Sequence, residues 1–236
     1  MKNIVLLLLL SASTIFAQQR VSKNLGDFNK LKVFSGLKVK LIKSDIPKIE
    51  IKGNNSEDVV VKNVNGMLKL SVTLPNAFDE DKTLVKLYFT NNLDLIDANE
   101  GAVITSDDKI KQDFIEIRTQ EGAEIELRIK AQNIKVKAVT GGVVILSGKV
   151  LNQDVITNTG GIYEGFDLQS QNAKVIAATG GEAEVNVTDL LEAKVKFQGF
   201  IVYKEKPKKL KKKRLLGGTV CAKDDYINRG GTRVYN

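Results

Sequence analysis

The side chains of this sequence that could do chemistry are carboxylates and lysines, because its 236 residues include no histidine. Histidine is the usual general base near neutral pH and the commonest ligand of transition metals. Its absence also excludes Ser-His-Asp and Cys-His catalytic arrangements. One enzyme chemistry that acidic side chains could supply is polysaccharide cleavage, which in glycoside hydrolysis requires two carboxylates about 5–10 Å apart.

Glu100 and Glu121 are the best-placed pair of carboxylates. They occupy similar positions in two successive sequence repeats, so stacked repeats would bring them together. In the next repeat Gly141 takes the matching position, which ends the row after two members. The acidic runs 79–81 and 107–108 fall in predicted turns, where aspartate is common, and neither has the alternating calcium-binding pattern. We therefore expect solvated surface carboxylates without metal or cofactor, and keep a polysaccharide lyase or hydrolase as the alternative.

The segment 204–214, KEKPKKLKKKR, carries eight lysine and arginine residues and one glutamate, a net charge of +7. The formal charge of the whole chain is +8, so nearly all of the excess is local. Packed side by side these residues would repel, which predicts an exposed loop that could contact surface glycans or other anionic envelope components, with an affinity that falls as salt rises. Few aromatic residues lie close enough to stack on bases, so we expect no specific nucleic-acid binding, and a merely solvated charge run is the alternative. The residues expected to contact a polyanion are Lys204, Lys206, Lys208, Lys209, Lys211, Lys212, Lys213 and Arg214.

The first 17 residues have the three-part pattern of a secretory signal peptide. Lys2 precedes an apolar run from Ile4 to Leu10, and small residues lead to an expected cleavage site after Ala17. The apolar run is too short to cross a bilayer as a helix, and we expect no transmembrane segment later in the chain. The sequence thus predicts an exported protein that is periplasmic, outer-membrane-associated or secreted. The single cysteine, Cys221, has no partner for an intramolecular disulfide and is expected to be a small buried hydrophobe.

From Leu93 onwards the sequence repeats a unit of about 20 residues, in which two β-like runs flank a glycine. Alternation of apolar and polar residues, as in AEIELRIKA at 123–131, predicts strands with one buried face. Together these features are typical of a β-solenoid, and we predict an all-β fold, a single-stranded right-handed β-helix with about 20 residues per coil. Glycine supplies the positive φ or the close backbone approach that a coil corner needs, whereas a phosphate-binding loop would need a lysine and a following helix. The predicted corner glycines, spaced 21, 20, 19, 20 and 18 residues apart, are Gly101, Gly122, Gly142, Gly161, Gly181 and Gly199.

A column of polar side chains is expected beside these corners, two residues before the first five glycines. Stacked from coil to coil, such side chains could hydrogen-bond to one another, as polar ladders do. The column comprises Asn99, Gln120, Thr140, Thr159 and Thr179.

Residues 25–90 are β-rich but less regular than the repeats. Short alternating runs are separated by the turn signals Asn54-Asn55, Asn65-Gly66 and Pro75-Asn76. We expect this segment to form atypical coils that cap the N-terminal end of one solenoid domain over 25–220, with 221–236 as a C-terminal tail.

The N-terminal runs FNKLKVFSGLKVKL, KIEIKG and VKNVNGMLKLSV are similar to the opening of the head GIN domain family of putative auto-transporter adhesins. The Gly-Gly repeats and the closing segments GFIVYKEKP and LLGGTV resemble the same family, so that the resemblance covers about residues 25–220. One departure is Glu205, which stands between Tyr203 and Pro207 where that family has glycine. The resemblance implies a β-helical fold and an envelope or surface location, and it brings no catalytic motif.

The favoured hypothesis is therefore an exported, non-enzymatic β-helix that acts as an adhesin-like or envelope-associated binding module for glycans or other surface polyanions. The alternatives are a carbohydrate-active enzyme and a purely structural envelope scaffold. Tyr163 and Phe166 could stack on sugars at a coil surface, although packing in the core is the favoured interpretation. A long groove lined by aromatic or acidic residues would favour glycan binding or cleavage, and a featureless polar surface would favour a scaffold.

Overall fold

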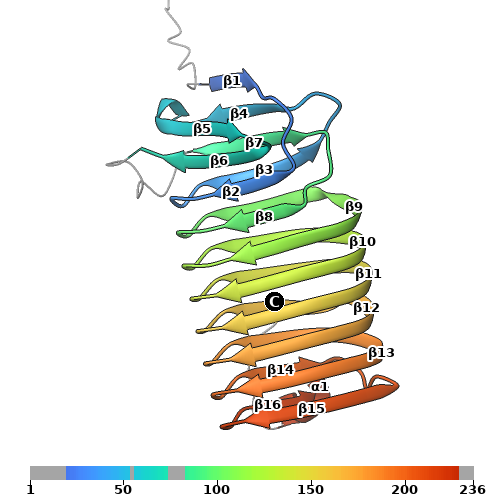
Figure 1. Ribbon diagram of the computed structural model, residues 1–236. Helices are drawn as coiled ribbons and strands as arrows, with labels where there is room; N and C mark the ends of the chain where they lie inside the picture. Colours follow the sequence, from blue (N-terminus) through green and yellow to red (C-terminus); the bar gives the residue numbers. More distant parts are fainter. Residues whose placement is uncertain (1–19, 54–55, 74–82, 229–236) are drawn as a thin grey trace, which may run out of the picture.

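The computed structural model describes residues 20–53, 56–73 and 83–228, so the predicted signal peptide lies outside the described residues. The chain is coiled into a β-solenoid of about 7 turns with roughly 19 residues per turn (Figure 1). Strands make up 71% of the described residues and helix 3%. The all-β solenoid predicted from the sequence repeat is therefore confirmed.

Five of the strands are 15–17 residues long, and each of these long strands forms most of one coil. The elements of the described residues are β1 (Arg20–Asn24), β2 (Lys30–Val33), β3 (Lys38–Lys43), β4 (Lys48–Lys52), the 3₁₀ turn η1 (Ser56–Asp58), β5 (Val59–Val64), β6 (Met67–Val72), β7 (Leu84–Phe89), β8 (Leu95–Ala98), β9 (Val103–Thr119), β10 (Glu124–Val139), β11 (Val143–Asn158), β12 (Ile162–Ala178), β13 (Glu182–Lys196), β14 (Phe200–Tyr203), β15 (Lys209–Leu215), β16 (Thr219–Ala222) and α1 (Lys223–Asn228).

Each long strand bends in its middle, so that its two halves lie on different faces of the solenoid (Figure 1). The short strands show this division: β3 and β14 pair with first halves of long strands, and β8 and β15 pair with second halves. We call the face of the first halves face A and the face of the second halves face B. The bend between them is the far bend, and the turn that joins one long strand to the next is the corner. All pairings between successive long strands are parallel.

The N-terminal end departs from the coil pattern because several of its strands are antiparallel. On face A, β4 lies between β1 and β7 and is antiparallel to both. On face B, the β5–β6 hairpin places β6 parallel to β2. The sheets of the described chain thus end in the antiparallel strands β1 and β5 (Figure 1). Strand β1 begins at Arg20, before the expected domain start at residue 25.

The lysine-rich segment is a strand over most of its length, and its prediction as a loop was wrong. Strand β15 runs from Lys209 to Leu215 and pairs in parallel with the second half of β13. Lysine is compatible with this strand because, within the described residues, β15 pairs on one side alone. Charged side chains on such an edge hinder pairing with a strand of another molecule. The expected tail is also ordered at its start, since Cys221 belongs to β16 and helix α1 follows.

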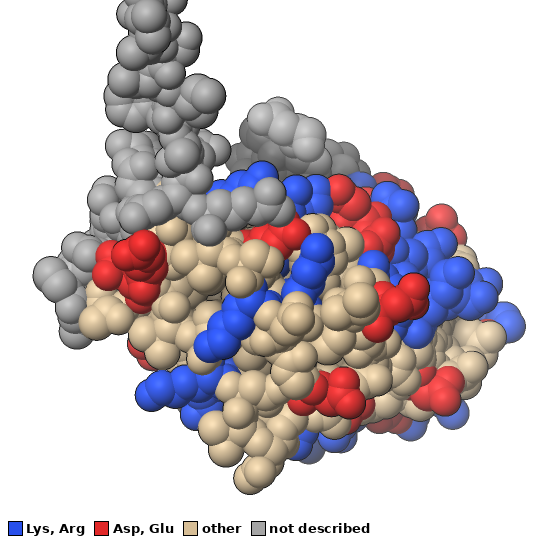
Figure 2. All heavy atoms as spheres, turned by 90° about the horizontal axis from the view of Figure 1, so that it is seen from above, with Lys and Arg blue, Asp and Glu red and all other residues tan. Residues whose placement is uncertain are grey.

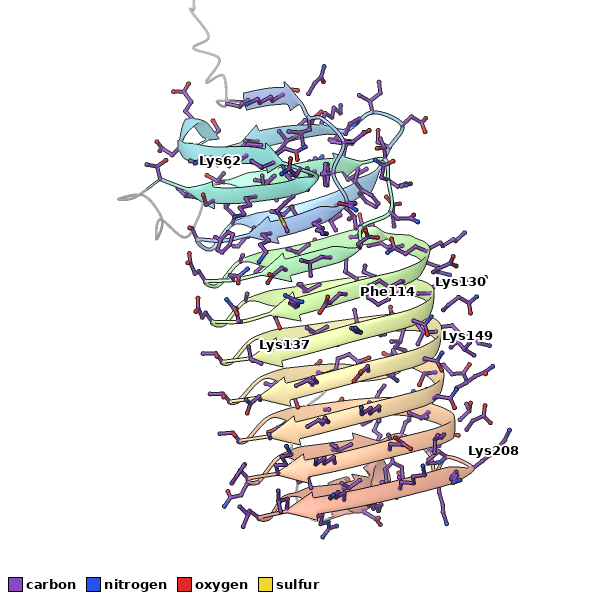
Figure 3. All side chains as sticks on the ribbon, in the orientation of Figure 1. Lys62, Phe114, Lys130, Lys137, Lys149 and Lys208 are labelled. Carbon is purple, nitrogen blue, oxygen red and sulfur yellow. The ribbon has the colours of Figure 1, made fainter. Side chains whose placement is uncertain are left out.

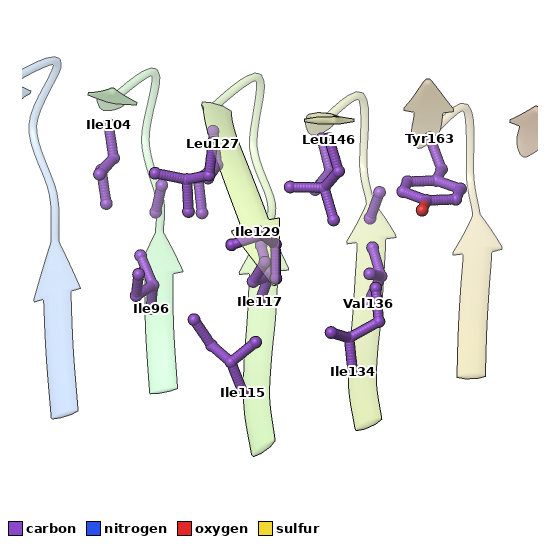
Figure 4. Packing of buried hydrophobic residues seen from close by; sticks show 14 of the residues in the cluster. Ile96, Ile104, Ile115, Ile117, Leu127, Ile129, Ile134, Val136, Leu146 and Tyr163 are labelled. Atoms are coloured by element: carbon purple, nitrogen blue, oxygen red, sulfur yellow. The ribbon is translucent and has the colours of Figure 1, made fainter. Parts of the chain in front are cut away.

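One hydrophobic core fills the solenoid, and the side chains that enter it alternate along each strand. In β10 the inward residues Ile125, Leu127 and Ile129 are buried, whereas the charged residues between them are exposed or half-buried. Equivalent side chains of successive coils stack on one another along the axis (Figure 4). Burial of an isoleucine or leucine contributes roughly 1.5–3 kcal/mol. A single coil has nothing to cover its apolar residues, so each coil depends on its neighbours for stability.

The corners are two-residue turns in which both central residues have positive φ. At one corner Thr159 has φ 50° and Gly160 has φ 71°, and the Gly161 N–H donates to the Asn158 carbonyl oxygen at 3.0 Å. These features are those of a type I′ turn. Successive corners are linked along the axis, because the Gly160 N–H donates to the Thr179 carbonyl oxygen at 3.2 Å. The central pairs of the coil corners are Glu100–Gly101, Glu121–Gly122, Thr140–Gly141, Thr159–Gly160, Thr179–Gly180 and Phe197–Gln198.

The six glycines predicted at the corners belong to two neighbouring columns. Gly101 and Gly122 are the second central residues of their turns, each with φ 71°. The other four come one residue later, outside the left-handed region, where a side chain would point into the preceding coil. A Cβ added to Gly161 would lie 2.0 Å from the Ala138 carbonyl oxygen, so close backbone approach is what requires glycine here. This second column contains Gly142, Gly161, Gly181 and Gly199.

The polar column predicted at the corners has the wrong register. Because Glu124 pairs with Val143, Thr140 is equivalent to Glu121 and not to Gln120. Thr140 therefore takes the position that the sequence interpretation had assigned to Gly141. The side-chain ladder of the described solenoid lies instead at the other end of the coil, where asparagines of successive strands hydrogen-bond to one another.

Replacing the corner threonines Thr140, Thr159 and Thr179 by asparagine is expected to raise the stability of the protein. Their φ values are 50°, 50° and 48°, and a β-branched residue is strained in this region. Asparagine tolerates it, and Asn-Gly is the preferred type I′ pair. We expect about 0.5–1 kcal/mol per site and a rise of roughly 5 °C in the melting temperature of the triple variant. Thermal unfolding followed by circular dichroism measures the rise, and a lower melting temperature would show that the threonine side chains make contacts that outweigh the strain.

Candidate functional site

The eight predicted polyanion contacts do not form one surface, because neighbouring residues of β15 point in opposite directions. Lys209, Lys211 and Lys213 lie at outward positions of face B. Lys212 and Arg214 lie at positions opposite the inward residues of β13, at the end of the core.

The basic residues before β15 lie at the far bend, and two of them have acidic partners. Lys204 Nζ lies 3.6 Å from Asp167 Oδ1, and Lys208 Nζ lies 2.6 Å from Asp189 Oδ1. Lys206 is exposed between them. The alternation of the chain thus divides the basic run among three regions of the surface.

Lys212 closes the C-terminal end of the core. Its Nζ donates to the Val220 carbonyl oxygen at 3.1 Å, and the same Nζ lies 5.3 Å from the centre of the Tyr203 ring. Val220 belongs to face A, whereas Lys212 belongs to face B, so the lysine stem crosses the open end of the solenoid. This side chain covers apolar surface with its methylene groups while its charge stays at the rim.

The outward lysines of β15 join lysines from the two preceding coils. The register places Lys213 beside Lys194, and Lys211 beside Glu192, which in turn lies beside Lys174. Adjacent strands are about 4.8 Å apart, so these side chains are near neighbours. Glu192 lies among them and pairs with Lys211, whose Nζ is 2.6 Å from Glu192 Oε1. We call this surface the basic patch, and it comprises Lys174, Lys194, Lys196, Lys209, Lys211 and Lys213.

The lysines of the basic patch repel one another. The charge of Lys196 lowers the pKa of Lys194, and partial desolvation and the charges of Lys213 and Lys174 lower it further. The charged form of Lys194 is thus less favourable in the folded chain than in the unfolded chain. This penalty is relieved as pH rises through the lowered pKa, or when an anion binds nearby. The surface seen from the N-terminal end differs, since acidic and basic side chains are interspersed there (Figure 2).

A groove on face B runs from Phe114 towards the basic patch, along the outward row next to the far bend. Asn152 Nδ2 donates to Asn133 Oδ1 at 2.8 Å, and Asn172 Nδ2 donates to Asn152 Oδ1 at 3.0 Å. Phe114 is 39% exposed at one end of this ladder (Figure 3), and Leu190 follows Asn172 at the other. The groove has a volume of about 480 Å³. We call it the asparagine groove, and its other wall contains Lys135, Asp154, Lys174 and Glu192.

The sequence interpretation missed the asparagine groove, although a signal is present. The dipeptides Gln-Asn, Asn-Gln and Gln-Asn recur at 132–133, 152–153 and 171–172, close to one coil apart. They fall between the two β-like runs of each repeat. The sequence prediction placed corners at the glycines and none at this point, which is the far bend.

A second hollow, of about 640 Å³, lies on face A beside the far bend. Its wall includes Glu164 and Glu184, which are opposite each other on neighbouring coils. Arg128 and Lys204 contribute positive charge to the same hollow. The mixed charges give it a polar character that differs from the predominantly basic patch on face B.

Of the carboxylates singled out from the sequence, Glu100 and Glu121 line neither hollow, whereas Asp107 lines the second one. Residues 107–108 belong to strand β9, so their prediction as a turn was wrong, and the run 79–81 lies outside the described residues. Glu100 and Glu121 are the first central residues of two corner turns, with φ 53° and 56°, and both are exposed. Ser35 Oγ donates to Glu100 Oε2 at 3.3 Å. This position on the outer edge of the solenoid gives a substrate no enclosing walls.

Tyr163 packs in the core, as favoured from the sequence. Its hydroxyl donates to Gln153 Oε1 at 2.9 Å, and Gln153 Nε2 donates to Ser170 Oγ at 2.7 Å. Burial raises the pKa of Tyr163 far above its ordinary value, so the hydroxyl remains a donor. Phe166 and Cys221 are also buried, in a small cluster separate from the main core.

Among the described residues, no helix has both the length and the apolar character needed to cross a bilayer. The same residues contain no group of three or more histidine, cysteine, aspartate or glutamate side chains arranged to hold a metal ion.

The solenoid is similar to several solved bacterial structures. A putative adhesin from Bacteroides fragilis has a TM-score of 0.80 and 18% identity, with 86% of this chain and 96% of the other covered. A putative adhesin from Parabacteroides distasonis has a TM-score of 0.70 and 18% identity, over 87% and 98% of the two chains. A putative lipid binding protein from the same species has a TM-score of 0.63 and 16% identity, over 86% and 96%. At these identities the similarity establishes the fold alone.

None of the curated proteins matches this chain. The family model described as putative auto-transporter adhesin, head GIN domain, matches residues 27–207, which is most of the chain. With the solenoid, its corner turns and its surfaces described, the chain therefore belongs to the head GIN domain family of putative auto-transporter adhesins.

Proposed function

We propose that the protein is an exported, non-enzymatic, adhesin-like binding module, and that the basic patch contacts anionic polymers of a cell envelope. The observation that carries the proposal is the concentration of six lysines on three successive coils of face B, with Glu192 among them. The family and two of the similar solved structures are described as putative adhesins, which supports a binding role. The pattern of a signal peptide in residues 1–17 supports export.

A lysine array on a solenoid is well suited to a repeating anion. The backbone of β12, β13 and β15 is held in a parallel ladder, so binding does not have to order a flexible segment. The repulsion that lowers the pKa of Lys194 is relieved when a negative charge lies over the patch. Exposed charges are screened over about 8 Å at physiological salt, so the contact should weaken as salt is added.

Reversing three charges, in the variant Lys194→Glu, Lys196→Glu, Lys213→Glu, is expected to weaken binding to dextran sulfate by about tenfold or more at low salt. Wild-type affinity should fall steeply between about 50 and 200 mM salt, and the variant should show a shallower dependence. Biolayer interferometry at several salt concentrations measures both quantities.

The matched control reverses Lys111, Lys130 and Lys149, a column of three exposed lysines at the far bend (Figure 3). It changes the net charge by the same amount, so a general charge effect would weaken dextran sulfate binding equally in both triple variants. Equal loss in the two variants, or no binding by the wild-type protein at low salt, would count against the basic patch.

A further inference from the structure

We infer that the asparagine groove binds an extended acidic polysaccharide that runs parallel to the solenoid axis, with acidic groups of the chain over the basic patch. The inference rests on the proposed function, and it specifies which class of anionic polymer is bound. Three features of the groove support it: a repeating row of amides, an exposed aromatic ring, and a change of charge towards the C-terminal end.

The asparagine ladder has hydrogen-bonding capacity left for a ligand. A side-chain amide has two N–H donors and an oxygen with two lone pairs. The Asn152 amide donates one hydrogen to Asn133 and accepts one from Asn172, which leaves one donor and one lone pair. Because adjacent strands are about 4.8 Å apart, these groups recur at a constant interval along the axis. The hydroxyl groups of an extended sugar chain also recur at a constant interval, and each hydroxyl both donates and accepts.

Phe114 presents an aromatic ring at the N-terminal end of the ladder (Figure 3). The side chain is 39% exposed, and Lys135 Nζ lies 5.8 Å from the ring centre. An aromatic ring offers apolar area at low entropic cost to the C–H face of a sugar ring.

A peptide strand fits the groove less well than a sugar chain. Strand addition to a sheet requires an unpaired backbone edge. Strands β10, β11 and β12 are paired on both sides, so the groove presents side chains alone.

The charge along the groove changes from balanced to positive. On the wall next to the ladder, Lys135, Asp154, Lys174 and Glu192 alternate in sign from coil to coil. One coil further, the register places Lys209 after Leu190 and Lys211 after Glu192. A chain bound along the groove would be held by hydrogen bonds and ring contact over the first coils and by charge at the end. A lipid headgroup would use the basic patch without the groove.

The test measures binding of the protein to alginate, polygalacturonate and chondroitin sulfate, with neutral dextran and phosphatidylglycerol vesicles as comparisons. Phe114→Ala and Asn152→Ala are each expected to weaken binding to an acidic polysaccharide by about tenfold, the equivalent of 1.4 kcal/mol, and to leave vesicle binding unchanged. Phe197→Ala and Gln169→Ala remove an exposed ring and an exposed amide outside the groove, and should bind as the wild-type protein does. Phe114 is exposed, so its truncation leaves the core intact.

The outcomes separate the inference from the proposed function. Acidic-polysaccharide binding that the lysine reversals reduce, but Phe114→Ala and Asn152→Ala do not, overturns the inference and retains the function of the patch. Binding to vesicles but to none of the three polysaccharides also overturns the inference, and assigns the patch to lipid. Binding to neither class overturns both.

Discussion

Replacing Gly161 by alanine is expected to lower the melting temperature by roughly 10 °C, through a loss of about 3 kcal/mol in the free energy of unfolding. The added Cβ would lie 2.0 Å from the Ala138 carbonyl oxygen and 2.3 Å from the carbonyl carbon. Both atoms belong to the backbone of the preceding coil, so no side-chain rotation can make room. The two coils must therefore separate. This separation lengthens the hydrogen bond from the Ile162 N–H to the Gly142 carbonyl oxygen, which is 2.9 Å in the wild-type protein. Thermal unfolding by circular dichroism measures the shift.

Gly160→Ala is the matched control, one residue away in the same turn. A Cβ at Gly160 meets nothing within 4 Å, although its φ of +71° strains any L-residue. That strain costs about 1–2 kcal/mol, and a smaller fall in melting temperature follows. The melting temperature of Gly142→Val should fall about as far as that of Gly161→Ala, because a Cβ at Gly142 would lie 2.7 Å from the Thr119 carbonyl carbon. If Gly160→Ala were the more damaging change, the strain of positive φ at Gly160 would outweigh the contact of a Gly161 side chain with the preceding coil.

Replacing Lys212 and Arg214 by valine is expected to make the protein associate through its C-terminal end. In the described chain β15 pairs with β13 alone, so one side of the strand offers backbone groups to another molecule. Positive charges at the end of the core oppose that contact. The double variant removes two of them, frees the Val220 carbonyl oxygen from Lys212, and extends the apolar row that begins at Leu210. Sedimentation velocity over a range of concentrations should detect dimers or longer assemblies.

The control for this variant is Lys130→Val with Lys149→Val. It also replaces two exposed lysines by valine, but on strands whose backbone is paired on both sides. If exposed valines alone caused association, both double variants would associate. A Lys212→Val, Arg214→Val protein that sediments as the wild-type protein does would show that the edge is protected by something other than these charges.

The lysine run illustrates what a linear sequence conceals about a surface. Read along the chain, residues 204–214 form one basic segment, and a loop was the natural expectation. In the folded chain alternation sends Lys211 to face B and Lys212 to the end of the core. The patch that results contains Lys174 and Lys194, which lie far outside the run. Such a set is defined by register between coils, which composition and local charge do not specify.

The corner residues show a similar limit at single-residue scale. The repeat spacing predicted corners at the right places along the chain, but grouped Gly101 with Gly142, which is one position further along its coil. The coils differ in length because the strand pairs contain register shifts near the far bend, as between Glu126 and Arg128. Counting residues along the sequence cannot show where such a shift falls. Equivalent positions in successive coils are defined only by the pairing of their strands.

The all-β solenoid, its approximate period and its family could all be predicted from the amino-acid sequence alone. The physical reason is that apolar alternation selects strands, and a strand too short to bury its own face must stack on a copy one period away. The tertiary structure decided which side chains share a surface: the basic patch, the asparagine groove and the exposed position of Glu100 and Glu121. Those surfaces depend on hydrogen-bond register between strands about 20 residues apart, and a shift of one residue moves a side chain from the surface to the core.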